Sequence, residues 1–336
     1  MMPTVFEICA GAGGQAIGLE AAGFDCVAAI EIDPHACETL RANREWNVVE
    51  KDVRLVDGSP HRGADLLAGG VPCPPFSIAG KQLGSDDERD LFPEALRLAA
   101  QIEPRAIMLE NVPGFASEKF RAYRHALFEK LRELGYVPDY KILNACNFGV
   151  PQLRPRCVIV ALRPDDFEIF EWPEGNGADP GTVGELIGDL MASNGWPGAA
   201  AWVERANGIA PTIVGGSKKH GGPDLGPTRA KQQWAQLGVD ALGVADAPPD
   251  RNFPATAMPK LTVPMVARIQ GFPGDWKFAG RKTAAYRQVG NAFPPPVANA
   301  VASAIARALR REVSDSVWHA RARTRESSSM DRPATL

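Results

Sequence analysis

The segment from Gly69 to Gly80, GGVPCPPFSIAG, places a cysteine between prolines in a loop flanked by glycines. Prolines fix φ and glycines permit unusual φ, so such a loop can hold the thiol of Cys73 in one strained, exposed position. A thiol held in that way is a candidate nucleophile once it loses its proton. A structural turn around a buried, inert cysteine is the alternative that this segment alone leaves open.

A carboxyl group and two guanidinium groups occur where other strands are expected to end or begin. Glu110 ends the apolar run RAIMLE and precedes Asn111 and a Pro-Gly turn, which would hold it in position. A carboxyl kept protonated there can act as a general acid toward a ring nitrogen. Arg154 and Arg156 lie two residues apart at the start of the strand QLRPRCVIVAL. Their side chains are expected to share one face, suited to gripping an anion or a carbonyl oxygen, although ordinary ion pairs remain the alternative.

A glycine turn near the N-terminus favours a nucleotide-like ligand. The segment AGAGGQAIG, between a predicted strand and a predicted helix, offers backbone N–H groups and a helix N-terminus. Glu31 ends the next strand and is placed to bind ribose hydroxyls, while Asp52 follows a third strand-like run and can accept an adenine amine. Dehydrogenases and methyltransferases share this pattern. The five histidines lie in helical, loop or tail contexts, which makes a hydride-transfer site the poorer hypothesis.

Strand and helix patterns alternate through the first third of the chain. Apolar runs such as VFEICA, CVAAIEID and RAIMLENV predict strands, and GAGGQAIGLEAAG and LFPEALRLAAQIEP predict helices. This order predicts an α/β fold with a doubly wound, mostly parallel sheet and helices on both faces. Ligands of such sheets bind at the carboxyl ends of the strands, where Glu31, Cys73 and Glu110 all fall.

The periodic pattern degrades near Pro173, which predicts a change of domain. Residues 1–173 form the expected catalytic and cofactor-binding domain, and residues 174–260, rich in Gly, Pro and Asp, are too long for a loop and predict a smaller, irregular domain. Residues 261–313 form a hinge and a helical C-terminal segment that is expected to pack back onto the first domain. Residues 314–336 are polar and aperiodic, so we expect a disordered tail.

Composition excludes several classes of protein. The 336 residues are 45% hydrophobic and 23% charged, as in soluble enzymes, and no apolar run is long enough to span a bilayer. The N-terminus lacks the basic region of a signal peptide. The six cysteines are scattered without a CxxC pair, so they predict neither a metal site nor a disulfide framework, as expected for a protein of the reducing cytoplasm. The net charge is −3, but residues 1–200 carry −12 and residues 201–336 carry +9. This asymmetry is expected if the second half of the chain binds a polyanion. The alternative is that it arises by chance from composition and an Arg-rich tail.

With these residues in place, the chain resembles the DNA cytosine-5 methyltransferases of the bacterial restriction-modification type. Eight motifs occur in the family's order, over about residues 4–170 and 260–310: FEICAGAGG, IEID, KDV, GGVPCPPFSIAG, ENVPG, QLRPR, LTVPMVARIQGFP and YRQVGNAFPPPVANAVA. The sequence departs from the family pattern at Pro74, where Gln is usual, at Cys9, where an aromatic residue often stands, and at Glu7, the acid that opens the first motif. None of these departures changes the thiol, the acid or the arginines.

The resemblance implies a role for each of these groups. The thiolate of Cys73 adds to carbon 6 of cytosine, Glu110 protonates or hydrogen-bonds ring nitrogen 3, and Arg156 holds the carbonyl oxygen. Arg154 and Ser77 would support the loop and the DNA backbone. The target base must leave the duplex to be reached, and the segment after Cys73 is similar to the family's mobile lid.

The resemblance also implies S-adenosylmethionine as cofactor in a methyltransferase sheet of the Rossmann-like kind. Gly11, Ala12, Gly13 and Gly14 would hold the methionine part of the cofactor, and Glu31 would hold the ribose. The adenine would lie between Ile32, Asp52 and Val53, with Pro72 and Leu91 nearby. Asn291 and Ala292 would bind the methionine carboxylate.

In this family the variable region, here residues 174–260, binds the recognition sequence of double-stranded DNA. Cationic side chains among glycines are the candidates for DNA contacts there: Lys218, Lys219, Arg229 and Lys231. We expect a monomer without a metal or a membrane partner, and a cognate restriction endonuclease is a possible partner. A tRNA cytosine-5 methyltransferase of the same family and a non-catalytic DNA-binding relative are the alternatives.

Overall fold

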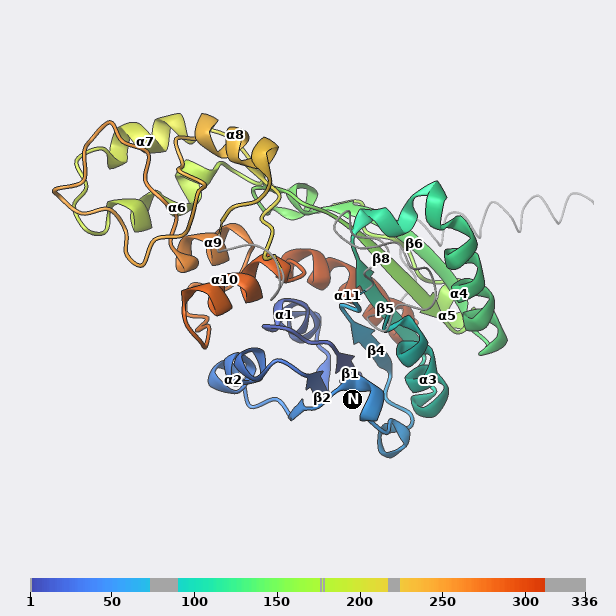
Figure 1. Ribbon diagram of the computed structural model, residues 1–336. Helices are drawn as coiled ribbons and strands as arrows, with labels where there is room; N and C mark the ends of the chain where they lie inside the picture. Colours follow the sequence, from blue (N-terminus) through green and yellow to red (C-terminus); the bar gives the residue numbers. More distant parts are fainter. Residues whose placement is uncertain (1, 73–89, 176, 178, 217–223, 312–336) are drawn as a thin grey trace, which may run out of the picture.

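A seven-stranded sheet organises the larger part of the molecule (Figure 1). The computed structural model describes residues 2–72, 90–175, 177, 179–216 and 224–311. The strand order is β3 (Val48–Glu50), β2 (Asp25–Glu31), β1 (Thr4–Ile8), β4 (Leu66–Gly69), β5 (Ala106–Asn111), β8 (Pro155–Leu162), β6 (Val137–Asn144). Only β8 runs antiparallel to its neighbours β5 and β6. The predicted α/β fold with a mostly parallel, doubly wound sheet is therefore confirmed.

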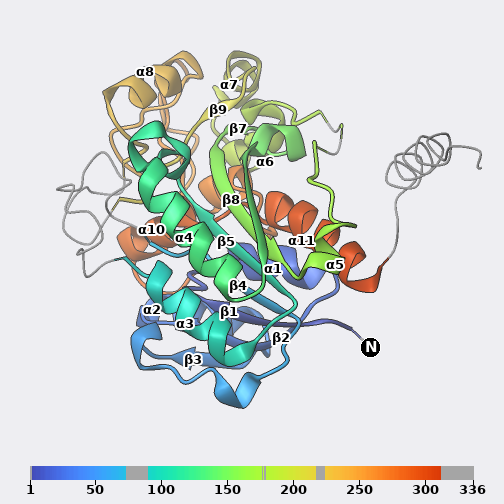
Figure 2. The same cartoon turned by 90° about the vertical axis from the view of Figure 1, so that its right-hand side faces the viewer.

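Helices cover both faces of the sheet (Figure 2). One face carries α3 (Phe92–Ile102) and α4 (Arg121–Glu133), and the other carries α1 (Gly14–Ala21), α2 (Pro34–Asn43) and α11 (Pro295–Arg310). Successive side chains of a strand point to opposite faces, so Ile107 and Leu109 of β5 enter one core and Met108 the other. Two buried layers thus hold the strand ends in place.

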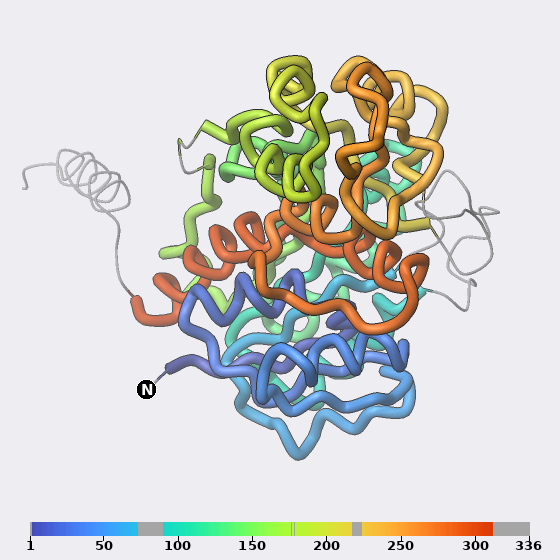
Figure 3. Tube along the Cα trace, turned by 90° about the vertical axis from the view of Figure 1, so that its left-hand side faces the viewer, coloured from blue at the N-terminus to red at the C-terminus, as the bar shows by residue number. Residues whose placement is uncertain are grey.

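The C-terminal helix α11 lies alongside α1 on this sheet (Figure 3). The two helices approach closely because α1 has a glycine at the contact: a Cβ on Gly18 would lie 2.5 Å from the Cβ of Ala298 and 2.6 Å from the carbonyl oxygen of Pro295. Helix α11 therefore belongs to the sheet lobe. Helix α11 ends at Arg310, and Arg311 takes the left-handed conformation.

A smaller lobe stands beside the carboxyl ends of the strands. It contains α6 (Val183–Ala192), α7 (Ala199–Arg205), β9 (Ala210–Pro211), α8 (Thr228–Gln236), α9 (Val263–Ile269) and α10 (Lys282–Asn291). Strand β9 pairs with β7 (Gln152–Leu153), and the short helix α5 (Pro164–Phe167) follows β8. One core contains a tryptophan cluster together with residues of α9 and α10, among them Trp196, Trp202, Trp234, Met265 and Val289. This core therefore continues past residue 260, where the sequence predicted a domain boundary.

Within the described part of the chain, no helix combines the length and apolar character that a membrane span requires.

Candidate active site

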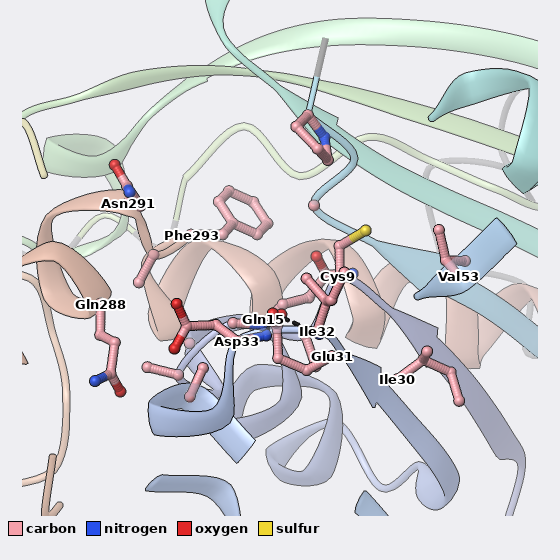
Figure 4. A pocket seen from close by; sticks show the side chains of 18 of the residues that line it. Cys9, Gln15, Ile30, Glu31, Ile32, Asp33, Val53, Gln288, Asn291 and Phe293 are labelled. Carbon is pink, nitrogen blue, oxygen red and sulfur yellow. Dashed lines mark hydrogen bonds between the residues drawn. The ribbon is translucent and has the colours of Figure 1, made fainter. Parts of the chain in front are cut away.

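A cavity of about 550 Å³ opens at the carboxyl ends of β1, β2, β4 and β5 (Figure 4). Eleven of the twelve residues predicted for cofactor binding line it: Gly11, Ala12, Gly14, Glu31, Ile32, Asp52, Val53, Pro72, Leu91, Asn291 and Ala292. The twelfth, Gly13, caps α1 instead with a φ of 88°. A Cβ on Gly13 would lie 2.9 Å from Leu40, so this glycine serves the packing behind the cavity.

The turn between β1 and α1 depends on left-handed backbone. Gly11 has a φ of 56°, and Cys9 takes a φ of 52°, which is strained for a residue with a side chain. Gly14 is required for another reason, since its Cβ would lie 2.4 Å from the carbonyl oxygen of Phe293. The turn thereby brings the first turn of α1 and the residues after α10 to one side of the cavity.

Glu31 is held rigidly at the end of β2. Its Oε2 accepts the N–H of Gly11 at 2.7 Å, and its Oε1 accepts the N–H groups of Ile32 at 2.8 Å and Asp33 at 2.7 Å. Because Oε1 accepts two of these hydrogen bonds and Oε2 only one, Oε2 keeps a lone-pair site with which the buried carboxylate can also accept a ribose hydroxyl. This arrangement fits the role predicted for Glu31.

Asp52 also lines the cavity and pairs with Arg54. The Nε of Arg54 is 3.0 Å from Oδ1 and its Nη2 is 2.5 Å from Oδ2. These hydrogen bonds lower the pKa of Asp52, so the carboxylate stays ionised at neutral pH. An adenine amine would share this acceptor with Arg54.

Glu110 is the residue before the last in β5 and forms a buried ion pair with Arg156 of β8. The Nε of Arg156 lies 2.8 Å from Oε1 of Glu110, and each side chain is only 11% exposed. Burial raises the pKa of Glu110, while the positive charges of Arg156 and Arg154 oppose that rise. The net direction is upward, which favours proton uptake by this carboxyl.

The flanks of the predicted cysteine loop are fixed beside Glu110. The amide of Asn111 donates to the carbonyl of Val71 at 3.0 Å, and the N–H of Leu91 donates to the carbonyl of Pro72 at 3.3 Å. Pro72 and Glu110 line the same cavity. Cys73 and Ser77, which follow Pro72 in the chain, lie outside the described residues.

A second cavity of about 290 Å³ lies where β5 and β8 meet the small lobe. Arg156 lines it, whereas its partner Glu110 lines the first cavity, and Asn291 lines both. The remaining lining is mostly apolar and comes from Val112, Pro113, Pro155, Thr212, Ile213, Val214 and Gly290. The ion pair therefore stands between two neighbouring binding spaces.

Arg154 does not share a ligand-facing side with Arg156, and that sequence expectation is wrong. Its guanidinium is fully buried and donates to the backbone carbonyls of Ile213 at 2.5 Å, Gly290 at 2.8 Å and Ala292 at 2.9 Å. A side chain used in this way has no surface to offer a DNA backbone. Arg154 instead joins β8 to both the small lobe and the rim of the first cavity.

Two buried glutamines complete this connection. Gln152 donates to Oε1 of Gln270 at 2.6 Å and accepts the N–H of Ile213 at 2.9 Å, while Gln270 donates to the carbonyl of Ala292 at 2.8 Å. Gln270 therefore has a structural role, and so does Arg268, which pairs with Asp189 at 2.6 Å.

Of the four predicted DNA-contacting cations, two lie in the described residues. Arg229 is exposed on α8 and makes no ion pair with another described residue. Lys231 pairs with Asp224, with 2.8 Å between Nζ and Oδ2. Lys218 and Lys219 fall outside the described residues.

Sequence reasoning missed several residues that line the first cavity, notably Gln15, Arg287, Gln288 and Phe293. Gln15 directly follows the glycine turn, Arg287 and Gln288 directly precede the motif VGNAF, and Phe293 is its last residue, so their positions beside predicted residues were the available signal. Among residues 2–72, 90–175, 177, 179–216 and 224–311, no group of three or more His, Cys, Asp or Glu side chains is placed to hold a metal ion.

The fold and these cavities define an α/β enzyme that binds a nucleotide-type cofactor at the ends of its parallel strands. The family model for C-5 cytosine-specific DNA methylase matches residues 3–307, and the chain belongs to that family. This confirms the family predicted from the motifs, an enzyme of the DNA cytosine-5 methyltransferase class, and the family implies dependence on S-adenosylmethionine.

Curated relatives match almost the whole chain. The Type II methyltransferase M.NaeI of Lentzea aerocolonigenes is 58% identical over 313 residues, which cover 92% of this chain and 76% of the relative. M.NgoMIV of Neisseria gonorrhoeae is 55% identical over 316 residues, which cover 93% and 100%. The structure of a Spodoptera frugiperda DNMT2 mutant matches with a TM-score of 0.62 at 18% identity, covering 90% of this chain and 99% of that one, and shows the shared fold alone.

Proposed function

We propose that this enzyme transfers a methyl group from S-adenosylmethionine to carbon 5 of a cytosine flipped out of a short, specific duplex DNA site, through a covalent adduct with Cys73. The observation that carries the proposal is the Glu110–Arg156 ion pair, which stands between two cavities beside the flanks of the Cys73 loop. The bound cofactor supplies an electrophilic methyl group.

The first cavity fits the cofactor in size and in chemistry. Its glycine turn and the N-terminus of α1 suit the methionine part, and the fixed carboxylate of Glu31 suits the ribose hydroxyls. Ile32, Val53 and Leu91 offer apolar surface to the adenine. Neither Cys9 nor Ile32 provides an aromatic ring there, so aliphatic and thiol contacts would take the place of stacking.

The protein groups would activate a carbon that is a poor nucleophile. The thiolate of Cys73 forms a bond to carbon 6, and the displaced ring electrons are accommodated as Glu110 delivers a proton to nitrogen 3. Arg156 donates to the carbonyl oxygen at carbon 2, where negative charge also develops. After methylation, carbon 5 loses its proton, the bond from sulfur to carbon 6 breaks, and nitrogen 3 returns its proton, which restores the aromatic ring.

The target base would occupy the second cavity, beside the ion pair and within reach of the first. A base stacked in a duplex cannot enter such a site, so the proposal requires base flipping. One subunit suffices for this chemistry, and we propose a monomer that protects DNA against a cognate restriction endonuclease.

A duplex containing 5-fluorocytosine within the enzyme's site tests the proposal, because fluorine cannot leave as a proton does and the covalent adduct accumulates. We expect a denaturation-resistant complex with the wild type, none with Cys73→Ala, and one with the control Cys146→Ala, whose thiol lies away from both cavities. Glu110→Gln should form the complex about 10²- to 10⁴-fold more slowly.

The site itself is found first by bisulfite sequencing of DNA from cells that express the enzyme. Methylated cytosines at one short sequence are expected. Transfer of label from the cofactor to tRNA but not to duplex DNA would instead favour the tRNA-acting alternative. Binding of DNA without adduct formation by the wild type would favour a non-catalytic relative.

A further inference from the structure

Arg287 is a cation of the first cavity to which the proposed roles assign nothing. It belongs to α10 and lines the cavity beside Gln288 and Asn291. The residue is half-buried, yet its guanidinium makes no ion pair or hydrogen bond with another described residue. Taking a charged group partly out of water is unfavourable unless an opposite charge compensates it. A half-buried arginine without such a partner therefore points to an anionic ligand.

The other cationic side chains that line the two cavities are compensated or solvated. Arg156 is paired with Glu110, and Arg54 is paired with Asp52. Lys51 is exposed, so water solvates its ammonium group. Among the described residues that line these cavities, the guanidinium on α10 is thus the only cation that is both half-buried and unpaired.

Arg287 lies close to the place where the two cavities meet the small lobe. Arg287 and Asn291 are four positions apart, so they share one face of α10, and Asn291 lines both cavities. The small lobe packs directly against this part of the helix, since a Cβ on Gly215 would lie 2.6 Å from the carbonyl oxygen of Arg287. Val214, the neighbour of Gly215, lines the second cavity. A ligand that enters the second cavity therefore passes near this helix face.

The cofactor is a poor candidate for the anion. S-adenosylmethionine carries a sulfonium and an ammonium group against a single carboxylate, so an additional cation in its cavity repels the molecule as a whole. DNA, in contrast, brings anionic groups to the mouth of the second cavity. A nucleotide whose base is flipped into that cavity remains joined to the strand by two phosphates, which stay outside the cavity.

We propose that the guanidinium of Arg287 binds a phosphate next to the flipped cytosine and thereby holds the extruded nucleotide at the second cavity. A guanidinium suits this role because its planar fork can donate two parallel hydrogen bonds to one phosphate. The inference rests on the proposed function, which supplies the flipped nucleotide.

The experiment neutralises the protein group and the phosphate in turn. A methylphosphonate linkage, in which a methyl group replaces one charged oxygen, is placed on the 5′ or the 3′ side of the target cytosine. Each duplex is titrated with enzyme in the presence of S-adenosylhomocysteine. Arg287→Met should bind unmodified DNA about 10-fold more weakly than the wild type. At one of the two positions the linkage should weaken the wild type by a similar factor and the variant hardly at all, because both changes remove one contact.

Arg281→Met is the matched control. Arg281 caps the N-terminus of the same helix, is exposed and lines neither cavity. Its substitution removes the same charge, but its effect on DNA affinity should add to that of the linkage at both positions. Calorimetry without DNA should give Arg287→Met and the wild type the same Kd for S-adenosylhomocysteine, which also shows that the variant is folded.

Two results would overturn the inference. If the effects of Arg287→Met and of the linkage add at both positions, the guanidinium does not contact either flanking phosphate. If Arg287→Met lowers the affinity for S-adenosylhomocysteine about 10-fold, the residue serves the cofactor instead. Failure of the proposed function is seen separately, as wild-type enzyme that binds the duplex but forms no adduct with 5-fluorocytosine.

Discussion

The two sides of the candidate site are built in different ways. On the cofactor side, Glu31 is fixed by the N–H groups of Gly11, Ile32 and Asp33, and Asp52 by Arg54, all close in sequence. The lobe junction, which we define as residues 152–156, 210–214, 270 and 290–292, is held by contacts between segments about 60 to 140 residues apart.

This difference has a physical consequence. A cofactor side made of short βα units is ordered by its own local hydrogen bonds. The junction depends on the packing of the whole molecule, since a single guanidinium, that of Arg154, binds carbonyls from the small lobe and from the end of α10. Arg156 and Asn291, which line the second cavity, lie within two residues of groups that this buried contact joins.

The largest expected effect is the loss of Arg154. In Arg154→Met the buried carbonyls of Ile213 and Gly290 lose this donor, while that of Ala292 keeps only the hydrogen bond from Gln270. We expect the free energy of unfolding to fall by at least about 3 kcal/mol. Urea unfolding measures it. The control is Arg97→Met, on the cofactor side, where the side chain also donates to two backbone carbonyls but is 34% exposed.

Water can replace the donors of Arg97, so its substitution should cost only about 1 kcal/mol. Equal decreases in the free energy of unfolding for the two variants would contradict the comparison. They would mean that the junction depends on the buried Arg154 no more than the cofactor side depends on the partly exposed Arg97.

The same difference explains what the sequence predicted. Glycines and acids near the ends of predicted strands located the cofactor side. Four of them, Gly11, Gly14, Glu31 and Asp52, line one cavity together with seven residues that the family resemblance implied. Strand alternation placed Arg154 beside Arg156, but the acceptors of Arg154 lie 59 to 138 positions away, and no local pattern encodes them. Likewise the small-lobe core runs past residue 260 because α9 and α10 bury their apolar faces there.

A second prediction concerns Glu7, buried beneath the cofactor side. Burial and the nearby charge of Glu31 raise the pKa of Glu7 from 4.5 to about 8. The folded protein therefore retains a proton that the unfolded chain releases, and this group's contribution to stability is present below pH 4.5 and is lost as pH rises toward 8. Its share of the unfolding free energy should fall by about 1.4 kcal/mol per pH unit across that window.

Glu7→Gln mimics the neutral carboxyl and should remove this slope. We expect the variant and the wild type to have similar stability near pH 5 and the variant to be more stable by a few kcal/mol at pH 8. Urea unfolding at four pH values provides the measurement. If the unfolding free energies of the wild type and Glu7→Gln change in parallel with pH, the pKa of Glu7 is not raised and its carboxyl is not neutral in the folded protein.

The smallest expected effect tests whether the small lobe contacts DNA beyond the junction. Arg229 is exposed on α8 without an ion pair among the described residues, whereas the charge of Lys231 is offset by Asp224. Fluorescence anisotropy titrations with a DNA duplex between about 50 and 200 mM salt give the slope of log Kd against the logarithm of the salt concentration. Arg229→Ala should reduce this slope by about 1, the change expected for the loss of one phosphate contact. Lys231→Ala should change it less, because its charge is already compensated. A larger effect at Lys231 would mean that DNA displaces Asp224, and an unchanged slope for Arg229→Ala would place this face of α8 away from the phosphates.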